Sequence, residues 1–230
     1  MRSQRRLVSP QIEETLDISG LQHYYKLNGN GNDSIGIKNA EIVNAVTYQA
    51  GSSGSEAIFN GSSSYVKLPS YLDGDSMTNV VSFTGFLTTA LESTVSRFVS
   101  FNGNRFGMYV SLRTNQDSGK LSVYVNSNII TVLSTDGITL TNRNFIVITI
   151  NKNGSIKIYI NGTLITSMLM NSNIGGHISP APRNYLGASR DGNYWHLNGT
   201  MEDWGFWNVE LTQERVTAIS NHQISGFELI

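Results

Sequence analysis

The sequence predicts an all-β protein, a sandwich of two antiparallel β-sheets with one short helix near the C-terminus. Three observations indicate this fold class. Short runs of alternating apolar and polar residues follow one another from Leu21 onward. Charged residues make up only 14% of the chain, whereas 22 Gly and many Asn supply turns. One stretch, 211–222, has the apolar spacing of a helix.

Each predicted strand is rich in β-branched or aromatic residues and lies between turn-forming segments such as "NGN" and "DSGK". About a dozen such strands joined by short turns are typical of a sandwich. The predicted strands are 21–27, 40–46, 56–61, 64–68, 79–87, 96–101, 105–113, 120–125, 129–133, 144–150, 155–167 (a hairpin), 184–189 and 198–207.

The hairpin at 155–167 has the clearest pattern. Three isoleucines alternate with Lys157 and Tyr159, and Asn161-Gly162 supplies two residues that tolerate the positive φ of a type I′ turn. The triplet Asn161-Gly162-Thr163 also matches the N-glycosylation pattern. Because such triplets arise by chance wherever Asn-rich turns occur, we favour the turn over the glycan.

The helix and the chain ends complete the predicted organisation. Thr212 can cap the helix at 211–222, which places Leu211, Val216 and Ile219 on one face. Residues 1–19 are polar and of mixed charge, with Pro10 interrupting any helix, so we expect a disordered or attachment arm. The sandwich is expected over 20–222, followed by a tail at 223–230.

Composition excludes several functional classes. The net charge of −1 and the pI of about 6.4 give no electrostatic basis for a nucleic-acid partner. No apolar run is long enough for membrane insertion, and the N-terminus lacks the apolar stretch of a signal peptide. The absence of cysteine excludes disulfides and thiolate chemistry.

Three segments in order resemble the laminin-G-like branch of the concanavalin A-like lectin/glucanase superfamily. They are "YYKLNGNGNDSIG" with "EAIFNGSSSYVKLP", then "IYINGTLI", then "YLGASRDGNYWHLNGTMEDWGFWNVELTQERV". Together they cover 21–222. The resemblance implies a concanavalin A-like jelly roll. The chain departs from that branch where the aromatic that often begins the "W-x-H-V-A" strand is replaced by Asn144-Phe145, and where "I-D-E-V" has become "MEDW".

Catalysis is not expected. Glycoside hydrolases of this superfamily carry paired glutamates as E-x-D-x-x-E, a spacing that does not occur here. Glu202 and Asp203 are adjacent on a predicted strand, so they should point to opposite faces. The four histidines show no metal-binding spacing, and no G-x-S-x-G motif occurs. We therefore expect a protein that is not an enzyme.

Calcium is the one cofactor considered. The loop "GNGNDSIG" (29–36) holds several side-chain oxygens but a single carboxylate, fewer than calcium prefers. Many relatives bind a structural calcium near such loops, and the resemblance implies Asp33 and Asp203 as the ligands here. The alternative is an Asn-rich loop without metal, and no cofactor is required in either case.

Alternation also predicts a binding face. Tyr109 and Arg113 on one strand, Tyr124 on the next, and Lys157 and Tyr159 on the hairpin should share the side opposite the core. In glucanase relatives the equivalent strands belong to the concave sheet that carries sugar, and tyrosine rings stack on sugars while polar groups bond hydroxyls. Trp195 lies in a second aromatic cluster with its two neighbours. The alternative is that tyrosines simply suit exposed strand faces.

These observations lead to a lectin-like, non-enzymatic binding or structural protein. Laminin-G-like domains usually act outside cells, yet no signal peptide is visible. A bacteriophage virion protein fits both facts, because it is made in the host cytoplasm and released by lysis. We expect a homo-oligomeric capsid decoration or tail fibre subunit on the virion surface, docked to virion proteins through residues 1–19 and able to contact host glycans. The alternative is an extracellular bacterial carbohydrate-binding module or adhesin domain.

Overall fold

The computed structural model describes most of the predicted sandwich. The described residues are 16–51, 54–69, 80–90, 96–102, 109–115, 120–125, 128–132, 139–151, 154–169, 184–188 and 194–230. Within 101–132 only the backbone is described, except for Leu121, Ser122 and Val123. Residues 1–15, most of the predicted arm, lie outside the described part.

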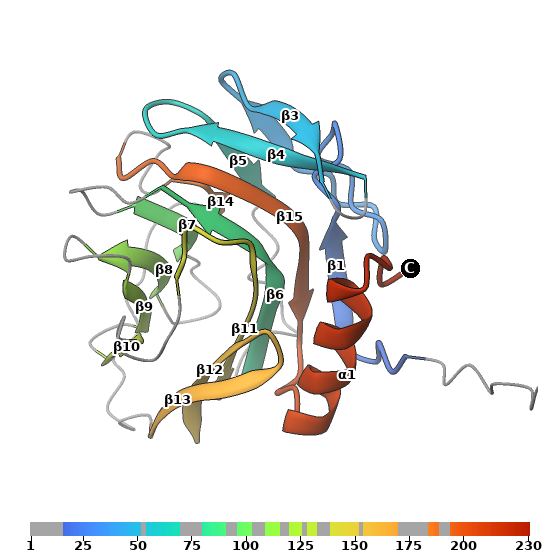
Figure 1. Cartoon of the computed structure of the whole chain (residues 1–230), viewed down its shortest axis with the longest axis vertical. Helices are drawn as coiled ribbons and strands as arrows, with labels where there is room; N and C mark the ends of the chain where they lie inside the picture. The colour runs from blue at the N-terminus through green and yellow to red at the C-terminus, as the bar shows by residue number, and fades with distance from the viewer. Residues whose placement is uncertain are drawn as a thin grey trace, which may run out of the picture.

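Two antiparallel sheets form the body of the molecule (Figure 1). One is eight-stranded, in the order β13 (Thr163–Leu169), β12 (Ser155–Ile160), β11 (Asn144–Asn151), β6 (Val80–Thr89), β15 (Asn198–Trp207), β4 (Ser55–Asn60) and β3 (Thr47–Ala50), with β1 (Leu21–Tyr25) paired to β15. The other is seven-stranded, in the order β10 (Asn128–Val132), β9 (Lys120–Val125), β8 (Tyr109–Asn115), β7 (Ser96–Asn102), β14 (Asn184–Leu186), β5 (Tyr65–Leu68) and β2 (Glu41–Val43).

The predicted fold class is therefore confirmed: an antiparallel two-sheet sandwich with a single helix among the described residues. The hairpin turn is confirmed as well, since Asn161 and Gly162 both have positive φ, 50° and 83°. Sequence patterns missed β3, whose four residues are half-exposed or exposed and carry little alternation. The predicted strand at 105–113 corresponds to β8. Residues 105–108 of that prediction lie outside the described part of the chain.

The main core fills the space between the sheets. Strand β11 shows how the sequence builds it: Ile146, Ile148 and Ile150 face this core, while Phe145 and Val147 face the other side of the sheet. Because both faces are covered, β11 is buried at seven of its eight positions, and its apolar residues do not alternate with exposed ones.

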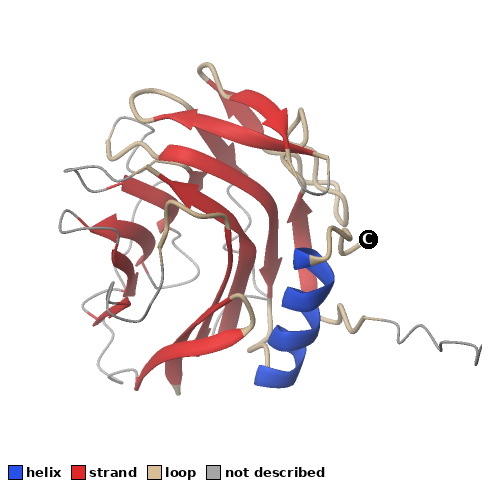
Figure 2. Ribbon diagram, in the orientation of Figure 1, coloured by secondary structure: helices blue, strands red, loops and turns tan. Residues whose placement is uncertain are grey.

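The helix α1 (Gln213–Ile224) covers the outer face of the eight-stranded sheet, beside β1 and β15 (Figures 1 and 2). Thr212 caps it by accepting a hydrogen bond from the Arg215 backbone N–H at 3.3 Å. The prediction of 211–222 was displaced by two residues. The buried side of α1 includes Val216 and Ile219, as predicted.

Between α1 and the outer face of the eight-stranded sheet lies a second apolar layer, and both ends of the described part of the chain join it. Leu16 and Ile18 pack against it, and Arg215 donates hydrogen bonds to the backbone carbonyls of Asp17 and Ser19. Residues 16–19, predicted as part of the arm, therefore contact the body of the protein. At the other end, Leu229 is buried in the same layer.

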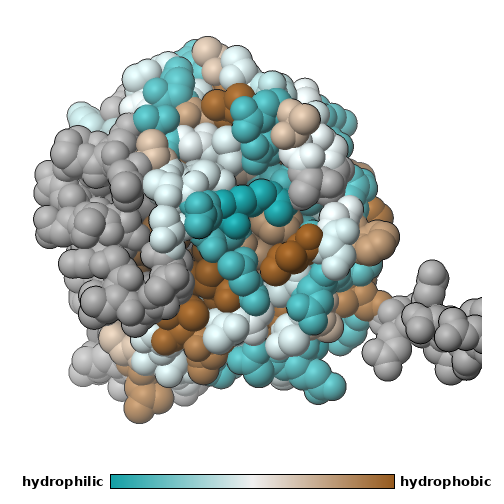
Figure 3. Space-filling model, viewed as in Figure 1, coloured by the Kyte–Doolittle hydropathy of each residue, from teal (hydrophilic) through white to brown (hydrophobic). Residues whose placement is uncertain are grey.

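The described part of the chain contains no helix long and apolar enough to span a bilayer. On the face drawn in Figure 3, apolar residues gather along the lower edge over β13, whose exposed apolar side chains are Leu164 and Leu169.

Candidate functional site

The predicted tyrosine face does not form one surface, because its residues belong to different sheets. Tyr109, Arg113 and Tyr124 lie on β8 and β9 of the seven-stranded sheet. Lys157 and Tyr159 lie on β12 of the eight-stranded sheet. Alternation along a strand shows which residues share one of its faces, but it does not show which sheet the strand joins.

The prediction that Tyr159 is exposed is wrong. Tyr159 is 2% exposed and packs under α1 in the second apolar layer. Lys157 is paired with Glu210, with 2.6 Å between Nζ and Oε1. The hydrogen bond that Lys157 donates to Glu210 is the main reason that the pKa of Lys157 lies above its ordinary value. Both side chains are therefore engaged by the segment that carries the helix.

Part of the seven-stranded face is closed as well. Ser122 shares the alternation of Tyr124 on β9 and is fully buried. The register nevertheless defines a row across this sheet on the side opposite the core. It runs Glu41, Lys67, Tyr185, Ser100, Ser111, Tyr124 and Ile129.

The open end of this row is the candidate site, here called the corner site: Glu41, Tyr65, Lys67, Tyr185, Trp195 and His196. On β5, Val66 and Leu68 point into the core, so Tyr65 and Lys67 point outward. Tyr65 meets Tyr185 edge to face at 5.5 Å between ring centroids. On its other side Tyr65 lies 6.4 Å from the ring of His196.

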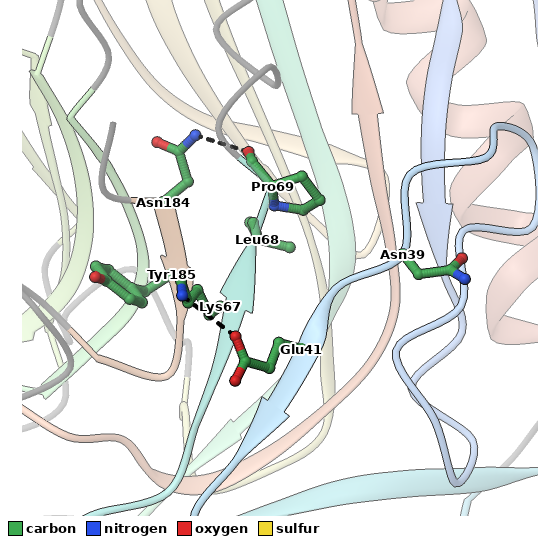
Figure 4. Close-up of a pocket in the computed structure, with 7 residues that line it drawn as sticks. All are labelled: Asn39, Glu41, Lys67, Leu68, Pro69, Asn184 and Tyr185. Atoms are coloured by element: carbon green, nitrogen blue, oxygen red, sulfur yellow. Dashed lines mark hydrogen bonds and ion pairs between the residues drawn. The ribbon is translucent and has the colours of Figure 1, made fainter. Parts of the chain in front are cut away.

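A pocket of about 240 Å³ opens at the Lys67 end of the corner site (Figure 4). Its lining comes from the loop before β2 and from β2, β5 and β14: Asn39, Glu41, Lys67, Leu68, Pro69, Asn184 and Tyr185. The Asn184 amide donates to the Pro69 carbonyl at 3.2 Å and ties β14 to the end of β5. Lys67 pairs with Glu41 at 3.2 Å, and more than half of each of these two side chains is exposed. Such an exposed ion pair contributes about 0–1 kcal/mol.

Trp195 marks the opposite end of the corner site. Its backbone φ of 53° is unusual for a bulky residue. The Trp195 carbonyl accepts the Arg97 backbone N–H at 2.9 Å, and the Arg97 guanidinium lies 4.0 Å from the centroid of its ring. The indole is 38% exposed, whereas Trp204 and Trp207 are fully buried. The fold thus holds one partly exposed indole in a fixed position.

His196 lies between the two ends. Burial lowers its pKa, against the opposing effect of a hydrogen bond with the Ser64 backbone, so the ring is neutral at pH 7. The corner site therefore combines aromatic rings, a neutral imidazole and one exposed lysine. This combination suits binding a polyhydroxylated ligand at a shallow surface.

Sequence patterns could have identified Tyr65, Lys67 and Tyr185. The run "SYVKL" alternates, and "NYLG" places one tyrosine between residues of the opposite face. The sequence does not show that β14 lies between β5 and β7 in the sheet. This arrangement brings Tyr65 into contact with Tyr185, which lies 120 residues later in the chain.

The two aspartates predicted for calcium do not fit a shared site. The Asp33 carboxylate accepts N–H bonds from Tyr24 and Ile35 and pairs with His23 at 2.7 Å. Burial opposes its ionisation, but the His23 bond and backbone donors outweigh burial and lower the pKa of Asp33. Asp203 instead lies near the hydroxyl of Tyr24, whose pKa is raised first by burial and then by this carboxylate. Asp33 therefore lies at the backbone N–H of Tyr24, whereas Asp203 lies near its side-chain hydroxyl.

No group of three or more His, Asp or Glu side chains suited to a metal occurs among the described residues.

Two buried glutamates also need an explanation, because paired carboxylates are the catalytic unit of glycosidases. Glu56 on β4 and Glu202 on β15 lie on the outer face of the eight-stranded sheet. Glu56 precedes Ala57 and Glu202 follows Met201, and Ala57 and Met201 are partners in the antiparallel register, so the two glutamates are neighbours. Arg143 binds Glu202 at 2.6 Å. A Cβ added to Gly51 would come within 2.8 Å of the Glu202 carboxylate, so the chain closes over this position. Gln49 donates a hydrogen bond to Glu56 as Arg143 does to Glu202, so both buried carboxylates are already bonded to protein donors.

Comparison with known proteins agrees with this architecture. Residues 60–217 match the family model described as the concanavalin A-like lectin/glucanases superfamily. A search of curated protein sequences found no significant match.

Three solved structures illustrate the similarity. Domain 4 of AbnA, a GH43 extracellular arabinanase from Geobacillus stearothermophilus, solved with arabinotriose, has a TM-score of 0.67 at 20% identity, covering 87% of this chain and 98% of that one. The botulinum neurotoxin serotype D/C VPI 5993 binding domain has a TM-score of 0.68 at 16% sequence identity, and the match covers 88% of this chain and 52% of that domain. Trypanosoma rangeli sialidase in complex with the inhibitor DANA has a TM-score of 0.66 at 14% sequence identity, and the match covers 91% of this chain and 34% of the sialidase. This chain thus spans about half of the toxin domain and a third of the sialidase, and identities this low establish the fold alone.

Proposed function

Because the chain belongs to the concanavalin A-like lectin/glucanase superfamily, we propose that it is a non-catalytic glycan-binding module whose binding surface is the corner site. The observation that carries this proposal is the strip formed by Lys67, Tyr65, His196 and Trp195, which are exposed or partly exposed at the edge of the seven-stranded sheet. Tyr185 is only 6% exposed and supports this strip by packing edge to face against Tyr65.

The physical argument is the match between this strip and a sugar. Exposed aromatic rings present flat apolar faces to C–H groups, while the Lys67 ammonium bonds hydroxyls. The outer face of the other sheet offers no comparable surface where α1 covers it. Structural neighbours support the ligand class, since one was solved with arabinotriose and another is from botulinum neurotoxin type C, whose cell entry depends upon interaction with two ganglioside molecules.

The test is a glycan array followed by titration of the oligosaccharide that binds, with Trp195→Ala and Tyr65→Ala. Both variants should lose most of the affinity while they remain folded, because each side chain is partly exposed. Leu169→Ala is the matched control: it removes an 81% exposed apolar side chain from β13 of the other sheet and should bind as the wild type does. An array without hits, or equal loss in all three variants, contradicts the proposal.

A more specific proposal is that this module is displayed on a bacteriophage virion and attached through its N-terminal arm. The sequence supports this proposal, because residues 1–15 are polar and of mixed charge and precede the segment that packs against α1. Deleting 1–15 should leave folding and glycan binding intact and abolish incorporation into particles. Unchanged incorporation would contradict the virion proposal without affecting the glycan-binding one.

A further inference from the structure

We propose that the pocket at the Lys67 end of the corner site selects a sugar residue that carries a carboxylate. This inference rests on the proposed glycan-binding function and specifies its ligand class. The shared chemistry is a pyranose carboxylate, which occurs in uronic acids and in sialic acids.

The size of the pocket limits its occupant to one sugar unit. Its volume of about 240 Å³ lies below the roughly 300 Å³ at which pockets for drug-sized ligands begin. The rest of an oligosaccharide would extend over Tyr65 toward Trp195, because Tyr65 lies two residues before Lys67 on the same face of β5.

Lys67 provides the charge. A lysine ammonium has three donors, and among the described residues Lys67 donates one hydrogen bond, to Glu41. That bond is exposed and weak, so a ligand carboxylate can share or replace Glu41 as the acceptor. In the opposite sheet, by contrast, Lys157 is held by Glu210 at 2.6 Å.

The surroundings also favour an anion. At the other end of the corner site the guanidinium of Arg97, itself 7% exposed, stacks on the ring of Trp195. Of the described charged side chains in the corner site, Glu41 is the one anion, and it lies on β2 at the edge of the sheet. A ligand that reaches from the pocket toward Trp195 therefore runs from one cation toward another.

The experiment uses isothermal titration of the full chain with two acidic probes, trigalacturonic acid and 3′-sialyllactose. Their uncharged counterparts are galactotriose and lactose. The wild type should bind at least one acidic probe more tightly than its counterpart, and the probe that binds identifies the source of the carboxylate. Lys67→Gln should weaken this binding about tenfold, the size expected of one hydrogen bond to a charged group.

Two further variants make the test specific. Glu41→Gln should strengthen acidic-probe binding up to about fivefold, because it removes the competing carboxylate of an exposed pair. Lys157→Gln is the matched control, since it removes a paired lysine from the other sheet, and it should leave binding unchanged. All three positions are at the surface or partly exposed, so the variants should fold.

The outcomes separate this inference from the proposed function. Equal affinity for acidic and neutral probes, with binding still lost in Trp195→Ala, would overturn the acid selectivity and leave the glycan-binding function standing. Equal weakening by Lys67→Gln and Lys157→Gln would also overturn it, because the charge effect would then be unspecific. If no probe binds and the array has no hits, both proposals fail.

Discussion

At the scale of single residues, burial separates the side chains that hold this fold from those available to a ligand. Glu202 is 1% exposed, and Arg143 bonds its carboxylate while lying 3.2 Å from the centroid of the Phe86 ring. Lys67 and Glu41 form a pair of the same chemical type, but in the open. Removing one partner of a buried pair costs about 3–5 kcal/mol, whereas an exposed pair contributes about 0–1. The exposed pair can therefore exchange partners, and the buried one cannot.

Tyr159 gives the clearest prediction at this scale. Tyr159→Ala should reduce the free energy of unfolding by about 3–5 kcal/mol, the cost of removing a buried aromatic ring, because it leaves a cavity under α1. Urea denaturation measures this loss. Leu169→Ala on the adjacent strand should change stability by no more than about 0.5 kcal/mol.

The folded fraction of Tyr159→Ala should bind glycan with wild-type affinity, because Tyr159 lies on the opposite sheet from the corner site. A variant that kept full stability and lost binding would restore the interpretation of Tyr159 as a ligand-contacting residue.

At the scale of elements, the strands other than β3 were predictable, whereas the sheet to which each strand belongs was not. The alternation of β12 correctly marked its isoleucines as core, and the Asn-Gly turn fixed where the hairpin ends. Alternation assumes one solvated face, however, and the eight-stranded sheet has apolar layers on both faces. For this reason Tyr159 of β12 was predicted to be exposed, although it packs under the helix. Lys157 is partly exposed, but it pairs with Glu210.

The residues of the corner site could also be found in the sequence, but their association in space could not. Tyr65 and Lys67 sit on a predicted strand, and Trp195 was a predicted site residue. Their association depends on β14, a strand of three residues whose neighbours β5 and β7 come from much earlier in the chain. The loop of Trp195 is then placed by backbone bonds, Leu197 N–H to Gly187 and Arg97 N–H to Trp195. Such long-range pairings leave no local signature in a sequence.

At the scale of the whole molecule, the two sheets play different parts. The eight-stranded sheet carries the helix and both described chain ends on its outer face, whereas the seven-stranded sheet carries the corner site. This division accounts for why one face can bind while the other stabilises the fold. It also places any attachment through the N-terminus on the helix side, at residues 16–18, on a different sheet from the proposed glycan surface.

The central claim is that a glycan binds at the corner site, and amide chemical-shift mapping tests it most directly. A ¹⁵N-labelled protein is titrated with the oligosaccharide selected on the array. The account predicts shifts concentrated in β2, β5 and β14 and in residues 194–197, with little change in β11, β12 or α1. Shifts centred on α1 and β12, with the corner site silent, would contradict it.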